Sequence, residues 1–154
     1  MTKPLKRLLR RNLLFYVSSN LLFNAIIPYL NFENPAAVPV FEGELCLARF
    51  VLPMAFLLPF IITADILRKV LLLQEKGRTE ITLPANFRKH RFVFGNAALN
   101  AIYTIIPIAL IFFCLPSAYA LDGMLAAAIT GILAAALAAW FTLQPVRKLL
   151  KLQP

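Results

Sequence analysis

Two pairs of asparagines lie inside long apolar stretches of this sequence and are its clearest candidates for chemistry. Asn20 and Asn24 are four residues apart, as are Asn96 and Asn100, so each pair lies on one face of a helix. A carboxamide surrounded by hydrocarbon needs hydrogen-bond partners, so both faces are expected to point into a helix bundle. Two interpretations are open: hydrogen bonds between the first and third helices, or a polar path or small-ligand site built from both pairs.

Four further polar residues lie near the ends of two other apolar stretches. Thr63 and Asp65 precede one basic segment, and Thr142 and Gln144 precede another at matching positions. With the asparagines they form the set of candidate ligand-binding or pore-lining residues. Asp65 is three residues before Arg68, which predicts an ion pair on one helix face. The alternative is a protonatable group coupled to transport, because acids inside membrane spans are usually functional.

Other side chains have simpler predicted roles. Arg49 is close in sequence to Glu42 and Glu44, which predicts local ion pairs, with a ligand clamp as the alternative. Cys46 and Cys114 both lie at the predicted outer ends of their spans, on the oxidising side of the membrane, so a disulfide is geometrically possible. Packing as small apolar side chains is the preferred interpretation for both.

The sequence carries no motif of an enzyme or of a cofactor site. It has no Walker loop, no dinucleotide-binding glycine pattern, no His-Glu-x-x-His and no Gly-x-Ser-x-Gly. The single histidine, His90, stands among basic residues without the cysteine, histidine or carboxylate neighbours that a metal site needs. We therefore expect no enzymatic activity, no cofactor and no bound metal.

The apolar stretches that hold these residues are long enough to span a membrane. Of the 154 residues, 60% are hydrophobic and 15% charged, and the mean hydropathy is +0.75, which is too apolar for a soluble domain. A transmembrane helix needs about 20 apolar residues, and such spans are predicted at about 12–30, 45–67, 92–115 and 121–146. The sequence therefore predicts an all-α, polytopic membrane protein with four helices. The many small residues of the fourth span predict that this helix packs closely.

The net charge of +9 would suit a nucleic-acid-binding protein, but the placement of the basic residues favours a topology signal. Five of the sixteen precede the first span, seven lie between the second and third spans, and three follow the last; Arg49 is the only other. The positive-inside rule then predicts that both the N and the C terminus are cytoplasmic. The expected partner is the lipid bilayer, and no nucleic acid is expected.

The chain is predicted to contain two copies of one two-helix unit. Asn-Leu-Leu-Phe-Asn-Ala-Ile at 20–26 is followed 76 residues later by Asn-Ala-Ala-Leu-Asn-Ala-Ile, and segment 63–74 matches segment 142–153 at six of twelve positions. This divides the chain into a first repeat at 1–76, a cytoplasmic linker at 77–91 and a second repeat at 92–154. Each unit has an even number of spans, so both insert in the same direction. That predicts a pseudo-twofold axis along the membrane normal.

Each unit resembles the bacterial two-helix membrane family known as domain of unknown function 2798. The resemblance rests on a first span with small polar residues, a short outer loop and a second span that ends in an aliphatic-Pro-aliphatic-Arg-basic-aliphatic tail. The second unit ends in Gln-Pro-Val-Arg-Lys-Leu at 144–149, whereas the first ends in Asp-Ile-Leu-Arg-Lys-Val at 65–70 and lacks the proline. The resemblance implies a four-helix inner-membrane protein and no established activity.

Two functions are open at this point. The leading hypothesis is permeation or transport of a small solute through a polar seam between the repeats, completed by a homodimer. The alternative is a structural or interaction subunit that packs against a partner membrane protein.

Overall fold

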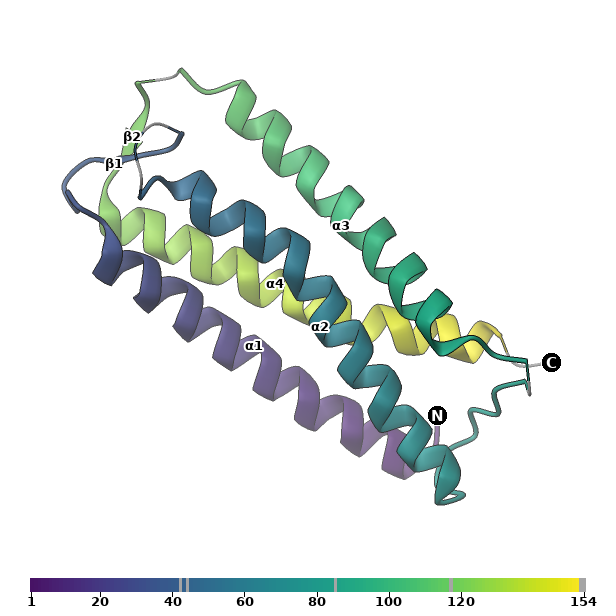
Figure 1. Cartoon of the computed structure of the whole chain (residues 1–154). Coiled ribbons are helices and arrows are strands. Elements are labelled where there is room, and N and C mark those ends of the chain that lie inside the picture. The colour runs from purple at the N-terminus through teal and green to yellow at the C-terminus, as the bar shows by residue number, and fades with distance from the viewer. Residues whose placement is uncertain (42, 44, 85, 117, 153–154) are drawn as a thin grey trace.

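The computed structural model is an all-helical bundle, as predicted (Figure 1). It describes residues 1–41, 43, 45–84, 86–116 and 118–152. Within these residues the long helices are α1 (Lys3–Asn31), α2 (Leu47–Glu75), α3 (Lys89–Phe113) and α4 (Gly123–Lys151). All four are long and apolar enough to cross a membrane, so the fold fits a multi-pass membrane protein.

The helices extend past the predicted spans where the chain is basic. α1 begins at Lys3 rather than near 12, α2 continues to Glu75 rather than 67, and α4 continues to Lys151 rather than 146. Lysine and arginine are good helix formers, and their long side chains carry the charge away from an apolar surface. The basic flanks therefore prolong the helices beyond the apolar stretches.

Both termini and the loop between α2 and α3 lie at one end of the bundle, called here the terminal end (Figure 1). At the opposite end, the strand end, β1 (Val38–Pro39) pairs antiparallel with β2 (Ala120–Leu121). α1 lies along α4, α3 lies along α2, and α2 and α4 pack against each other. α1 and α3 therefore flank a central α2–α4 pair from opposite sides.

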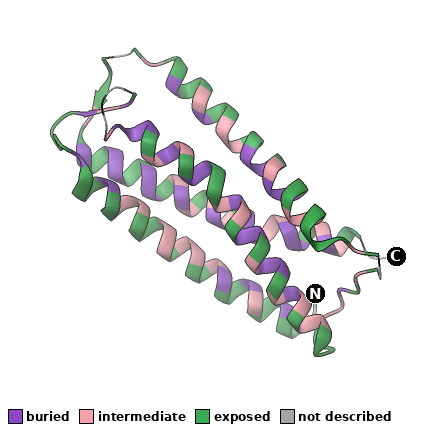
Figure 2. Ribbon diagram, viewed as in Figure 1, coloured by how far each residue is buried: buried purple, intermediate pink, exposed green. Residues whose placement is uncertain are grey.

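In the part of the chain that the structure describes, buried apolar side chains form two clusters. One lies under the strands and includes Val38, Val51 and Phe112, and the other lies toward the terminal end and includes Ile66 and Phe141. Much of α1 and α3 is exposed (Figure 2), and the exposed residues include many large apolar ones. Only 6% of the most apolar stretch of α1 is buried, against 44% in both α2 and α4. Such outward faces suit hydrocarbon, where apolar side chains need no cover.

Two helix ends are closed by local hydrogen bonds. The side chain of Asp122 accepts hydrogen bonds from the backbone of Met124 and Leu125, which caps the first turn of α4. α2 ends in a Schellman motif: Gly77, at φ +61°, donates to the carbonyl of Gln74, and Arg78 donates to that of Leu73. This turn sets the direction in which the chain leaves α2.

α1 and α4 approach each other closely at Gly131. A Cβ placed on this glycine would lie 2.7 Å from the backbone oxygen of Leu21 and 2.9 Å from the Cβ of Ala25. Neighbouring contact positions on α4 are also small, and Ala127, Ala134 and Ala138 are buried. Small residues let two backbones come together in a membrane. The predicted close packing of the fourth helix is therefore confirmed, with α1 as its partner.

Gly131→Ala should destabilise the bundle even though alanine is the better helix former. The added methyl group meets backbone atoms of α1, and such overpacking costs about 1–3 kcal/mol. Gly95→Ala in α3 is the matched control, because a Cβ there meets nothing within 4 Å, and it should stabilise the helix by up to about 1 kcal/mol. Unfolding in detergent, followed by circular dichroism, measures both changes. Equal shifts for the two variants would contradict the contact.

Candidate functional site

A group of polar side chains connects α3 with α2 and α4 inside the bundle; we call it the α3 amide cluster. It consists of Thr63, Asn96, Asn100, Trp140 and Gln144. The amide nitrogen of Asn96 donates to the hydroxyl of Thr63 at 3.3 Å, and that of Asn100 donates to the Oε1 of Gln144 at 3.2 Å. The indole nitrogen of Trp140 donates to the Oδ1 of Asn100 at 3.3 Å. Asn96 and Asn100 are each only 4% exposed.

The α3 amide cluster leaves some hydrogen-bonding capacity unused. The Oδ1 of Asn96 is buried and accepts no hydrogen bond from the described residues. No described residue accepts a hydrogen bond from the amide nitrogen of Gln144, whose side chain is half-buried. An unpaired buried acceptor costs free energy, so it is a natural place for an additional donor. The cluster can thus bind a further polar group.

A groove of about 590 Å³ runs beside this cluster, between α3 and α4. Its apolar walls are Leu99, Tyr103 and Leu137, and the amides of Asn100 and Gln144 lie at its polar side. Leu99, Tyr103 and Trp140 are exposed, so the groove opens to the outside of the bundle. We call it the α3–α4 groove; Thr104, Trp140 and Lys148 complete its lining.

The other asparagine pair has a different environment. The amide nitrogen of Asn20 donates to the backbone oxygen of Tyr16 at 2.8 Å, and that of Asn24 donates to the backbone oxygen of Asn20 at 3.0 Å. Both side chains are half-buried and bond only within α1 among the described residues. The expected bonds between the first and third helices are therefore not found there; α3 bonds to α2 and α4 instead, because α1 lies on the far side of that pair.

Asp65 belongs to a second group of polar side chains, the α1–α2 polar cluster, with Asn12, Tyr16 and Lys69. Lys69 lies 2.5 Å from the Oδ2 of Asp65 and donates to the Oδ1 of Asn12 at 2.6 Å. The Tyr16 hydroxyl also donates to Asp65, and the ammonium of Lys69 lies 5.5 Å from the Tyr16 ring centroid. The carboxylate thus has an opposite charge and a hydroxyl donor, and the cluster ties α1 to α2.

The predicted ion pair between Asp65 and Arg68 is wrong. Arg68 is exposed, and Asp65 pairs with Lys69, one residue further along. Positions three and four residues away are both neighbours on a helix, so spacing alone does not decide between them. Here Lys69 lies on the side of α2 that faces α1, where Asn12 and Tyr16 add further contacts.

The remaining candidates are placed as follows. Thr142 is fully buried and donates to the backbone oxygen of Ala138 at 2.7 Å, within its own helix. Cys46 is buried and Cys114 exposed, and both are free thiols. Glu42 and Glu44 lie outside the described residues, so the ion pairs predicted for Arg49 stay predictions. His90 is exposed, and in the described residues no three His, Cys, Asp or Glu side chains form a metal-binding group.

Sequence reasoning missed four residues of these clusters: Asn12, Tyr16, Lys69 and Trp140. Two signals could have found some of them. Tyr16 is one helical turn before Asn20, and Lys69 belongs to the Arg-Lys pair that recurs at 147–148. Nothing in the sequence pairs Trp140 with Asn100, because that contact depends on the crossing of α3 and α4.

Comparisons with protein-family models, with curated proteins and with solved structures found no match to this chain. The resemblance of each unit to a two-helix membrane family stays a prediction.

Asp65→Asn should destabilise the protein by about 1–3 kcal/mol, because it leaves the partly buried ammonium of Lys69 without its carboxylate. Asp65→Asn combined with Lys69→Met removes both charges and should recover part of this loss. Arg68→Met is the matched control: the side chain is exposed, so the change should stay within about 0.5 kcal/mol. Unfolding by sodium dodecyl sulfate in mixed micelles measures all three. A loss for Arg68→Met as large as for Asp65→Asn would contradict the assigned pairing.

Proposed function

We propose that this membrane protein binds a small uncharged solute in the α3–α4 groove and conducts it across the bilayer. The observation that carries the proposal is the meeting of Asn100 and Gln144 at the edge of a groove that opens to the outside of an apolar bundle. Polar side chains inside membrane spans usually face a partner or a pathway. The available amide nitrogen of Gln144 favours a solute that accepts hydrogen bonds.

The lining of the groove limits the chemistry of the solute. Leu99, Tyr103 and Leu137 offer apolar contact, whereas Asn100 and Gln144 offer amides on one side only. Ligand sites of this type combine apolar walls with a few polar groups that orient the ligand. A compact molecule with one polar side matches the groove better than a hydrated ion does.

We further propose a bacterial inner-membrane location with both termini in the cytoplasm and two parallel repeats. The basic residues of the N-terminus, the middle loop and the C-terminus gather at the terminal end of the bundle, in agreement with the positive-inside rule (Figure 1). In the proposed duplication α1 corresponds to α3, α2 to α4 and β1 to β2. The contact of α1 with α4 then corresponds to the contact of α3 with α2, and β1 pairs with its own counterpart. Both relations support a pseudo-twofold axis between α2 and α4.

Replacing both groove amides, in Asn100→Leu with Gln144→Leu, should lower solute permeability by at least about fivefold, since one lost hydrogen bond of 1 kcal/mol already gives that factor. The measurement is stopped-flow light scattering of proteoliposomes with glycerol and acetamide. Asn20→Leu with Asn24→Leu is the matched control, because it removes two amides from α1 that bond only within their own helix. The control should conduct like the wild type.

Fluorescence gives a second readout. Trp140 is the only tryptophan and lines the groove, so solute binding should change its emission. Wild-type permeability no higher than that of protein-free liposomes, with no change in Trp140 emission, would contradict the proposal.

A second function is favoured by the outward face of α1. Phe15, Leu22, Phe23 and Ile26 are 50% exposed or more, and only 6% of the most apolar stretch of this helix is buried. Such a face can pack against another transmembrane helix as well as against lipid. In this alternative the chain is a subunit of a membrane assembly, and its proposed partner is a second copy of the same chain.

Leu22→Cys in a Cys114→Ser background should form a disulfide-linked dimer in oxidised membranes if two copies meet through α1. Leu110→Cys on α3 is the matched control, because Leu110 is 61% exposed and Leu22 is 55% exposed. Non-reducing electrophoresis detects the dimer. Equal cross-linking at both positions would show random collision and would exclude α1 as a specific interface.

A further inference from the structure

We propose that the terminal end of the bundle holds a specific site for the phosphate-bearing headgroup of an anionic phospholipid. The site is a groove of about 620 Å³ between the start of α1, the end of α2 and the loop that follows α2. Four cations line it: Lys3, Arg7, Arg11 and Arg78. The proposal does not depend on the solute-binding function, because it concerns a different part of the molecule.

Three of the cations share one face of α1. Lys3, Arg7 and Arg11 are spaced four residues apart, so successive side chains are separated by about 6 Å along the helix. All three are exposed. In the described part of the chain none of them makes an ion pair or a hydrogen bond through its side chain. A row of unpaired cations of this spacing fits the oxygens of a phosphodiester.

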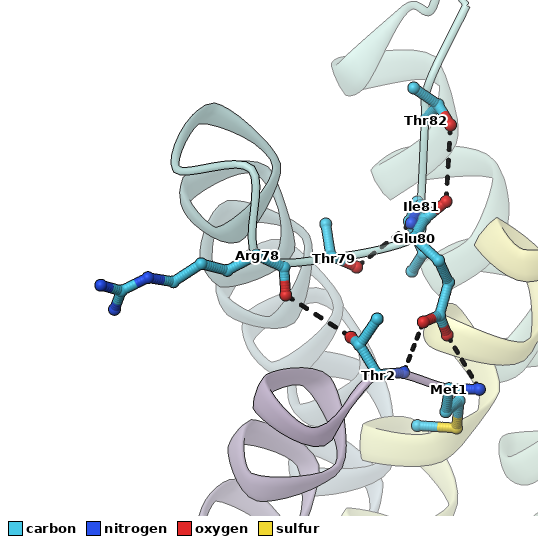
Figure 3. A network of polar contacts seen from close by, with 7 residues as sticks. All are labelled: Met1, Thr2, Arg78, Thr79, Glu80, Ile81 and Thr82. Carbon is cyan, nitrogen blue, oxygen red and sulfur yellow. Dashed lines mark hydrogen bonds and ion pairs between the residues drawn. The ribbon is translucent and has the colours of Figure 1, made fainter.

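Arg78 reaches this row through the turn that ends α2. The Schellman motif at Gly77 turns the chain toward α1, and the backbone oxygen of Arg78 accepts a hydrogen bond from the Thr2 hydroxyl at 3.5 Å. The nearby carboxylate of Glu80 bonds instead to the backbone nitrogen of Thr2 and, at 3.1 Å, to the terminal ammonium of Met1. Figure 3 shows the Arg78 side chain pointing away from Glu80. No acidic side chain of the described residues lines the groove.

The position of the groove identifies a lipid rather than a free anion. The cations lie just before the apolar stretch of α1, at the level where a bilayer has its headgroups. Leu8 and Leu73, both half-buried, line the same groove. These two leucines provide an apolar surface for the glycerol and the first acyl carbons of a phospholipid. Inorganic phosphate has no such apolar part.

Native mass spectrometry of the full chain in detergent tests this with phosphatidylglycerol and phosphatidylcholine. Phosphatidylglycerol should bind more tightly than phosphatidylcholine. Arg7→Gln with Arg78→Gln should weaken phosphatidylglycerol binding about 25-fold, given about fivefold for each cation near a membrane surface. Arg147→Gln with Lys151→Gln is the matched control, because it removes the same charge from exposed positions on α4. It should bind phosphatidylglycerol like the wild type.

Two further measurements separate the site from misfolding and from simple charge. Arg7→Lys with Arg78→Lys keeps both charges, so its affinity for phosphatidylglycerol should stay within about threefold of the wild type. That change is smaller than the loss expected from removing one surface cation. Inorganic phosphate should not displace phosphatidylglycerol. An equal loss in the control, equal binding of phosphatidylcholine, wild-type binding by the Arg7→Gln and Arg78→Gln variant, or displacement by inorganic phosphate would each overturn the proposal.

Discussion

Hydrocarbon offers no hydrogen-bond partners, so every polar side chain within a membrane span must find one in the protein. In this bundle that constraint draws Asn96 and Asn100 against α2 and α4, and it draws Asp65 and Lys69 against Asn12 and Tyr16 of α1. These contacts specify how the helices are rotated relative to one another. Apolar side chains alone would do so weakly, because lipid covers them as well as a neighbouring helix does.

Close packing provides the second constraint. The small face of α4 at Gly131 brings α1 against it, and the α1–α2 polar cluster holds the same helix on its other side. α3 is attached less closely to α4: it packs along α2, and it meets α4 mainly through hydrogen bonds of Asn100 to Gln144 and Trp140. The α3–α4 groove is open for that reason, and its polar side is where the two helices do meet.

The two halves of the chain use matching positions for different chemistry. Under the proposed duplication Gln144 corresponds to Asp65, Lys148 to Lys69 and Phe92 to Tyr16. In the first half the carboxylate, the ammonium and the phenol close the contact between α1 and α2. In the second half a neutral amide replaces the carboxylate and Phe92 replaces the phenol at the matching position, and the α3–α4 groove lies open beside the corresponding contact. The proposed binding site in one half only is the expected result of such divergence.

The sequence alone predicts the four long apolar helices, the positions of their polar residues and the tight packing of α4. It does so because length, composition and residue spacing are local properties. The sequence also identifies Asn96, Asn100, Thr63 and Gln144 as polar residues in apolar surroundings. It does not determine their partners. Only the tertiary structure decides that Asp65 pairs with Lys69, that Trp140 bonds to Asn100 and that the two asparagine pairs do not bond to each other. These contacts depend on which helices are neighbours and on how they cross. Interactions between residues far apart in the chain determine both.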